Sequence, residues 1–147
     1  MYEFEYQKPA SLDDVVRQLS DEDAKLVAGG MTLIPTLKLR LAKPTQLIDL
    51  AAIPSLKGIS EDGDAVVIGA MTRHADVNRS DVVKRAIPAL AAMAGMIGDP
   101  AVRNRGTIGG SIANNDPAAD YPAAPRPAGS DPVNMRTVRF ATRLIRA

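Results

Sequence analysis

The first stretch that could do chemistry is a pair of glycines, Gly29 and Gly30, between an apolar segment and a segment of helical character. Glycine has no Cβ and readily adopts positive φ, so a ligand can approach the backbone closely at such a turn. The N–H groups at the start of a helix lack partners within the helix and attract anions. The turn therefore predicts a cradle for a phosphate or pyrophosphate group. On this segment alone a plain strand–turn–helix connection is the alternative, because neither Gly-x-Gly-x-x-Gly nor Gly-Lys-Ser/Thr is present.

The second stretch begins at Gly106 and contains another glycine pair, Gly109 and Gly110, after the dipeptide Thr107-Ile108. Small polar residues follow the pair: Ser111, Asn114, Asn115, Asp116 and Asp120. The carboxylates can accept hydrogen bonds from ribose or ribityl hydroxyls, and the other side chains add neutral donors and acceptors. For this stretch alone, a solvent loop with Asx turns is the alternative. Two glycine pairs some 80 residues apart, each after a predicted strand, favour a bound dinucleotide.

The remaining side chains offer little acid–base or metal chemistry. The chain has no Cys, which excludes a disulfide, a thiolate-ligated metal cluster and a cysteine nucleophile on it. We interpret His74 as a solvated residue on a surface helix, and Met93 and Met96 as core-filling residues. Arg103 and Arg105 could meet a phosphate or another subunit, or could simply be solvated. No catalytic residue and no metal ligand is predicted, so redox chemistry would come from a bound cofactor.

The composition is that of a soluble globular protein, with 46% hydrophobic and 24% charged residues among 147. Three Tyr, two Phe and no Trp argue against a stacking platform for single-stranded nucleic acid. The N-terminus does not resemble a secretory signal, and no window approaches a membrane span, so we expect a cytoplasmic protein. The charge is uneven: residues 1–124 carry a net −3 and residues 125–147 a net +4. An acidic body is thus followed by a short basic tail.

Hydrophobic periodicity and turn residues predict an alternation of strands and helices. The predicted strands are 3–6, 25–28, 47–50, 65–68 and the short piece 107–108 within a loop region at 98–124. The predicted helices are 12–20 with Ser11 as N-cap, 31–41, 72–78, and 81–96 divided or kinked by Pro88. This mixture indicates an α/β or α+β class.

Four segments together resemble a known family: Lys25–Pro35, Lys38–Leu41, Ile68–His74 and Ile97–Ala123. They are similar to the FAD-binding medium subunit of molybdenum hydroxylases, the group that includes carbon monoxide dehydrogenase and the FAD domain of xanthine dehydrogenase. The resemblance covers residues 1 to about 124. It implies an α+β fold of the vanillyl-alcohol-oxidase type, with FAD lying between two subdomains. The first subdomain would be 1–58, the second, incomplete one 59–124, and 125–147 a basic tail outside the family pattern.

The resemblance also implies which residues bind FAD. The first pyrophosphate loop would comprise Leu26, Val27, Ala28, Gly29, Gly30, Met31, Thr32 and Leu33. The second flavin loop would comprise Thr107, Gly109, Gly110 and Ser111. The acidic contacts would be Asp116 and Asp120, of which Asp120 falls where the family places an acidic residue on the cofactor. Met31 departs from the pattern, since relatives usually carry a polar residue there and Met cannot replace its hydrogen bond.

The function implied by the resemblance is electron transfer within a hetero-oligomer. A large subunit would hold a molybdenum cofactor, a small subunit two [2Fe–2S] clusters, and the FAD of this chain would pass electrons to an external acceptor. No nucleic acid and no membrane partner is expected. Family members continue to roughly twice this length, so a truncated or frameshifted chain is expected, with a tail that could form a short basic helix. The alternative function is a non-enzymatic remnant with weak or no FAD binding. A Rossmann-type nicotinamide dehydrogenase is disfavoured by the missing glycine fingerprint.

Overall fold

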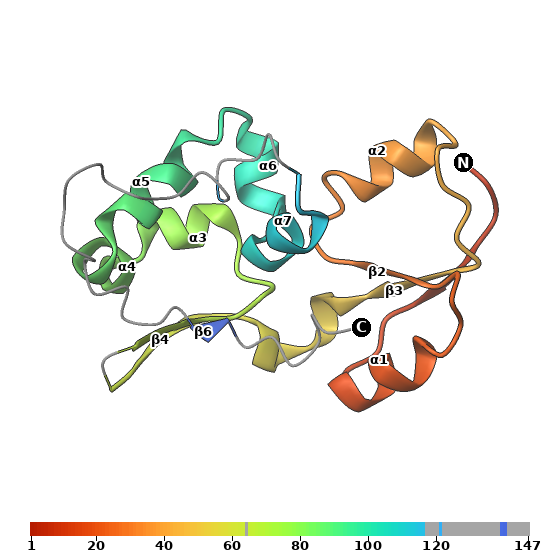
Figure 1. The fold of residues 1–147 in the computed structure, drawn as a ribbon, viewed down its shortest axis with the longest axis horizontal. Coiled ribbons are helices and arrows are strands. Elements are labelled where there is room, and N and C mark those ends of the chain that lie inside the picture. Colours follow the sequence, from red (N-terminus) through yellow and green to blue (C-terminus); the bar gives the residue numbers. More distant parts are fainter. Residues whose placement is uncertain (64, 117–120, 122–138, 141–147) are drawn as a thin grey trace.

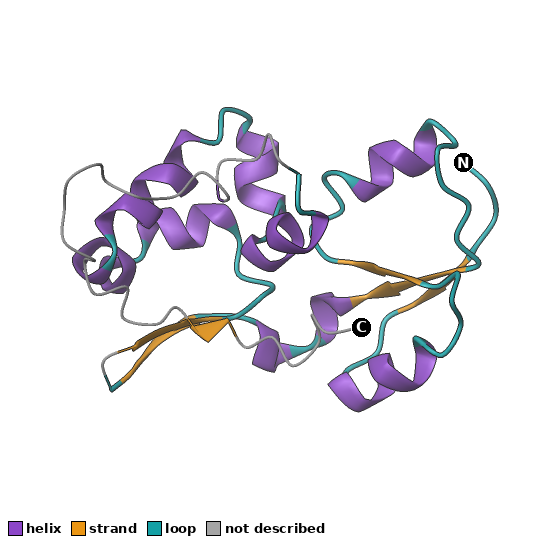
Figure 2. Ribbon diagram, in the orientation of Figure 1, coloured by secondary structure: helices purple, strands orange, loops and turns teal. Residues whose placement is uncertain are grey.

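Strands and helices alternate through the first part of the chain, and helices dominate after residue 73 (Figures 1 and 2). The computed structural model describes residues 1–63, 65–116, 121 and 139–140. Within this part of the chain, two three-stranded sheets are joined by two short 3₁₀ turns, η1 (Leu50–Ala52) and η2 (Pro54–Leu56). The α+β class predicted from the sequence is confirmed.

The first sheet is entirely parallel and has the order β1-β3-β2. Its strands are β1 (Glu5–Gln7), β2 (Lys25–Val27) and β3 (Gln46–Asp49). Helices α1 (Leu12–Gln18) and α2 (Leu33–Lys38) lie on opposite sides of this sheet in Figure 1. The central strand β3 carries the buried pair Leu47 and Ile48, and Ile48 packs in one core cluster with Val15 of α1. The predicted strands and helices of this half are confirmed, with bounds that differ by a few residues.

The predicted N-cap of α1 is confirmed by two hydrogen bonds. The Ser11 hydroxyl accepts from the Asp14 N–H at 3.2 Å and donates to the Asp14 carboxylate at 2.6 Å. The bond from Ser11, followed by the charge of Arg17, lowers the pKa of Asp14. Asp13 and Asp14 also place negative charge at the positive end of the helix dipole. Local side-chain chemistry thus fixes the start of this helix.

The second sheet has the order β4-β5-β6. Strand β4 (Ile59–Asp62) pairs antiparallel with β5 (Ala65–Ile68), and β6 (Arg139–Phe140) pairs parallel with β5. The predicted strand at 65–68 is confirmed. Strand β4 was not predicted, because its residues are mostly polar and exposed and show no apolar alternation. The expected basic helix in the tail is wrong at residues 139–140, which form a strand.

Five short helices follow β5 in the described part of the chain: α3 (His74–Arg79), α4 (Asp81–Ala86), α5 (Pro88–Met96), α6 (Pro100–Arg105) and α7 (Ile108–Asn114). The predicted division at Pro88 is confirmed, since this proline occupies the first turn of α5. The predicted loop with a strand at 107–108 is wrong. Asp99 caps α6 through the Ala101 N–H at 2.6 Å, and Thr107 caps α7 through the Gly110 N–H at 3.1 Å. The cap on α7 stabilises a helix that contains Gly109 and Gly110, two residues of low helix propensity.

Two side chains lie where the sequence did not predict. His74 is 3% exposed, so the interpretation as a solvated histidine is wrong. Met96 is 77% exposed, so it does not fill the core, whereas Met93 is half-buried. The core between β5 and the helices is instead built from aliphatic residues: Val66, Ile68, Val77, Val83, Ala91, Ala94 and Ile108. Among the residues that the structure describes, no helix is long and apolar enough to cross a membrane.

Candidate functional site

A cavity of about 620 Å³ lies where the turn between β2 and α2 meets the start of α7. Figure 1 shows these two segments side by side between the two halves of the molecule. The predicted site residues that line the cavity are Leu26, Ala28, Gly29, Gly30, Met31, Thr32, Leu33, Thr107, Gly109, Gly110, Ser111 and Asp116. Val27 is buried in the protein and does not line it, and Asp120 lies outside the described residues. The two glycine-containing stretches therefore meet at one site.

The β2–α2 turn offers a row of backbone donors to this cavity. Within the part of the chain described, the N–H groups from Gly29 to Leu33 donate to no protein acceptor. The first bond of the helical turn comes from the Ile34 N–H, which donates to the Gly30 carbonyl at 3.1 Å. Gly30 has a φ of 71°, a conformation that a residue with a Cβ adopts only at a cost. Adjacent unpaired N–H groups at a helix start form a site for an anion.

The start of α7 differs, because its N–H groups are already used. Ile108 donates to the Thr72 carbonyl at 3.0 Å, and Gly109 donates to the Ala70 carbonyl at 2.9 Å. A Cβ built on Gly109 would lie 2.6 Å from the Ala70 Cβ, so this glycine serves close packing. The second glycine pair is thus the first turn of a helix anchored to the β5–α3 connection, and the predicted turn after a strand is wrong.

Polar side chains of α7 offer hydrogen-bonding groups to the cavity, because the backbone N–H groups at the start of this helix are already paired. Ser111 and Asn114 line the cavity and add a hydroxyl and a carboxamide to it. Asp116 lies just beyond the helix and adds an exposed carboxylate to the lining. This side of the cavity can therefore bind hydroxyl and amide groups, whereas the opposite side can bind an anion.

Gly29 has a structural role that the sequence did not reveal. A Cβ at this position would collide with the Arg105 carbonyl oxygen and would lie 2.7 Å from the Gly106 Cα. The β2–α2 turn therefore packs directly on the end of α6. The prediction attributed the missing Cβ to close approach by a ligand, but the structure shows that another backbone segment uses this space.

Several residues of the lining were not predicted: Lys25, Leu50, Leu56, Ala70, Met71, Gly106 and Ala113. Asn114, predicted as a neutral donor and acceptor, also lines the cavity. Leu50, Leu56 and Met71 give the cavity an apolar wall, which suits a planar ring system. In a sequence, scattered apolar residues of this kind cannot be distinguished from core residues. Only the folded structure shows that they line the cavity. Leu50 and Leu56 belong to the connection that joins the two sheets, and Met71 belongs to the connection between β5 and α3.

The position of Leu50 depends on Asp49 at the end of β3. Asp49 accepts a hydrogen bond from the Ala51 N–H at 2.8 Å and another from the Tyr6 hydroxyl at 2.5 Å. The hydrogen bond to this carboxylate, together with desolvation and its negative charge, raises the pKa of Tyr6. The two bonds fix the start of η1 and hence the leucine that lines the cavity.

His74 acts in packing beside the cavity and does not line it. Its backbone N–H donates to the Gly106 carbonyl at 3.2 Å, and its Nδ1 lies 2.8 Å from the Tyr121 hydroxyl. The two rings are stacked with centroids 5.3 Å apart. A Cβ on Gly106 would lie 3.0 Å from the imidazole, so the glycine allows this packing. Within the described residues, no group of three His, Cys, Asp or Glu side chains could hold a metal ion.

A mixed fold with a backbone-lined cavity places the chain in the class of α+β cofactor-binding domains. Residues 2–136 match the family described as the FAD binding domain in molybdopterin dehydrogenase. The chain belongs to this family, whose cofactor is FAD. The match extends beyond residue 124, at which the sequence resemblance was expected to end.

Named relatives agree with this assignment. The chain is 52% identical over 122 residues to the carbon monoxide dehydrogenase medium chain of Hydrogenophaga pseudoflava, covering 82% of this chain and 42% of the relative. It is 34% identical over 124 residues to the xanthine dehydrogenase FAD-binding subunit of Escherichia coli O157:H7, with the same coverages. The solved carbon monoxide dehydrogenase of H. pseudoflava superimposes with a TM-score of 0.80 at 52% identity, covering 82% of this chain and 42% of that chain. The chain thus spans less than half the length of these relatives.

We predict that Gly29→Ala separates the β2–α2 turn from α6. The added methyl group meets backbone atoms of Arg105 and Gly106, which cannot rotate away. Overpacking of this kind typically costs about 1–3 kcal/mol. Urea unfolding measures the loss. The matched control is Gly98→Ala, because a Cβ there has nothing within 4 Å. Equal stability of the two variants would contradict the packing role of Gly29.

Proposed function

We propose that this chain is the FAD-binding part of an electron-transfer subunit in a molybdenum-containing hydroxylase. The observation that carries the proposal is the row of unpaired N–H groups from Gly29 to Leu33, which line a cavity of suitable size. Membership in the FAD-binding family supports it. The relatives named above are the medium chain of one dehydrogenase and the FAD-binding subunit of another.

The residues of the cavity fit the parts of FAD. The N–H groups from Gly29 to Leu33 would bind the pyrophosphate, because they are adjacent, unpaired and located at a helix start. The apolar wall of Leu50, Leu56 and Met71 would pack against a ring and exclude water from it. The remaining polar residues would bind hydroxyl and ring polar groups: Thr107, Ser111, Asn114, Asp116 and Asp120.

The partners follow from the same proposal. When bound, FAD would accept electrons one or two at a time and so link iron–sulfur clusters to an external acceptor. Because this chain has no Cys, those clusters would belong to a small subunit, and substrate chemistry to a molybdenum-containing large subunit. A cytoplasmic location and the subdomain bounds 1–58 and 59–124 are further predictions. The chain itself would bind and orient the cofactor without a catalytic side chain.

A second candidate function is a remnant that binds FAD weakly or not at all. The 147 residues span about 42% of the length of these relatives, so FAD binding by this stretch alone is the property to test. FAD titration of the purified chain separates the two functions. We predict a yellow protein with one FAD per chain and submicromolar affinity. A colourless chain that does not respond to FAD would contradict the proposal and support the remnant.

A second prediction concerns Met31, which lines the cavity. The family resemblance implies a polar residue at this position. Met31→Gln restores a hydrogen-bonding group, and one such bond is worth roughly 0.5–1.5 kcal/mol. We expect FAD to bind roughly 2- to 12-fold more tightly, measured by fluorescence titration. The control is Met96→Gln, because Met96 is 77% exposed and lies outside the cavity. Equal or weaker binding by Met31→Gln would show that this side chain does not face the cofactor.

A further inference from the structure

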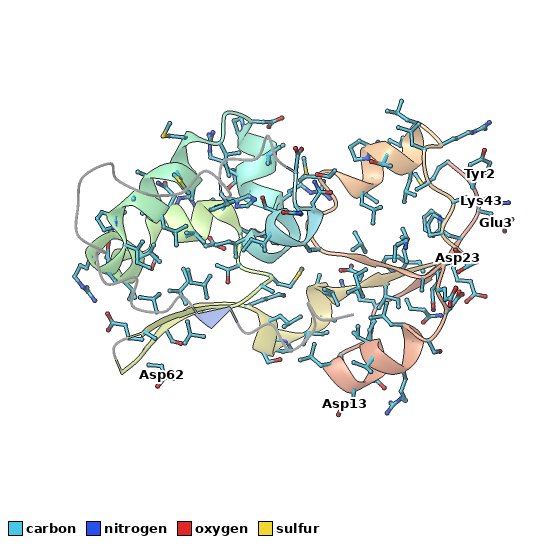
Figure 3. All side chains as sticks on the ribbon, viewed as in Figure 1. Tyr2, Glu3, Asp13, Asp23, Lys43 and Asp62 are labelled. Carbon is cyan, nitrogen blue, oxygen red and sulfur yellow. The ribbon has the colours of Figure 1, made fainter. Side chains whose placement is uncertain are left out.

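Helix α2 begins at the cavity, and its other end carries an exposed patch of apolar and basic side chains. We call this the α2-end patch and define it as Tyr2, Lys38, Leu39, Arg40, Leu41 and Lys43. Leu39 is 70% exposed and Leu41 is 73% exposed, an unusual state for two leucines so close in the chain. Figure 3 shows Tyr2 and Lys43 together at this end of the molecule.

The backbone at the end of α2 holds the leucines in place. The Arg40 N–H donates to the Leu37 carbonyl at 3.0 Å and the Leu41 N–H donates to the Thr36 carbonyl at 3.1 Å. This pair of bonds is the Schellman arrangement, which requires a left-handed residue that is usually glycine. Here Arg40 takes that conformation, with a φ of 59°. Since the turn is hydrogen-bonded, the leucines form a defined surface on an ordered turn.

The basic side chains of the patch form no ion pair with the residues that the structure describes. The Arg40 guanidinium and the Lys43 ammonium lie 5.6 Å and 5.5 Å from the centre of the Tyr2 ring. In the described part of the chain, no carboxylate, including that of the neighbouring Glu3, lies within 4 Å of the charged groups of Lys38, Arg40 or Lys43. Residues 1–124 carry a net charge of −3, so the patch is a positively charged region in an otherwise acidic part of the chain.

We propose that the α2-end patch docks an acidic protein face with an apolar centre, supplied by another subunit of the complex. This inference rests on the proposed function. Exposed leucines surrounded by uncompensated cations match such a face in both polarity and charge. Helix α2 has six residues and begins at the cavity, so the docked subunit would lie about 9 Å along the helix from the anion site.

The test is co-expression of the 147-residue chain with the other subunits of the H. pseudoflava carbon monoxide dehydrogenase, followed by affinity purification and native mass spectrometry. We expect the unmutated chain to co-purify. The double variant Leu39→Ser/Leu41→Ser should reduce the recovered complex at least tenfold, and Arg40→Glu/Lys43→Glu should do the same. The control is Val16→Ser, because Val16 is a 57% exposed apolar residue on α1. This control should assemble like the unmutated chain.

FAD binding by each purified variant is measured separately and distinguishes docking from cofactor binding. Loss of assembly with unchanged FAD binding supports the docking surface. Assembly by the Leu39→Ser/Leu41→Ser variant at the unmutated level overturns it, as does failure of the unmutated chain to assemble. A homodimer of the chain alone that disappears in the patch variants also overturns it, because the occupant would then be a second copy. Absence of FAD binding in every chain would contradict the proposed function, whereas assembly that still depends on Leu39 and Leu41 would support the docking surface.

Discussion

Close backbone packing at Gly29 is the constraint on which the site depends. The β2–α2 turn lies directly against the end of α6, with no room for a Cβ between them. This contact joins the parallel sheet to the helical half and brings the turn next to the start of α7. The turn also keeps its own N–H groups unpaired, since its first helical bond begins at Ile34. The contact thus forms one edge of the cavity, and the conformation of the turn leaves its donors available.

The two glycine pairs have different physical roles despite their similar appearance in the sequence. The first pair forms a turn with free donors, and its Gly30 provides the positive φ. The second pair lies inside α7, where Gly109 packs against Ala70 and donates to its carbonyl. The cavity is consequently asymmetric, with an anion site on one side and polar side chains with an apolar wall on the other. Such a division suits an elongated cofactor that carries a pyrophosphate at one point along its length.

Local signals were sufficient for much of the fold. Ser11 capped a helix, Pro88 divided one, and the apolar run at 65–68 formed a strand, because each depends on neighbouring residues. Helix α7 was missed because capping by Thr107 outweighs its two glycines. Helix α6 was missed because it is short and lies between glycines, and its start depends on the cap from Asp99. The apolar wall of the cavity was missed because Leu50, Leu56 and Met71 are indistinguishable from core residues until the chain folds. The position of Gly29 and Gly30 between a predicted strand and a predicted helix indicated an anion site. The resemblance to a family identified FAD as the expected ligand.

The central claim is that the backbone amides of the β2–α2 turn bind the pyrophosphate of FAD. Amide chemical shifts of the ¹⁵N-labelled chain, recorded during titration with FAD and with riboflavin, test it most directly. The account predicts that FAD shifts the amide protons from Gly29 to Leu33 downfield, while those of Ile108 and Gly109, already bonded within the protein, move little. Riboflavin, which has no pyrophosphate, should leave the turn amides unchanged. Equal responses to both ligands, or shifts at α7 without shifts at the turn, would contradict the account.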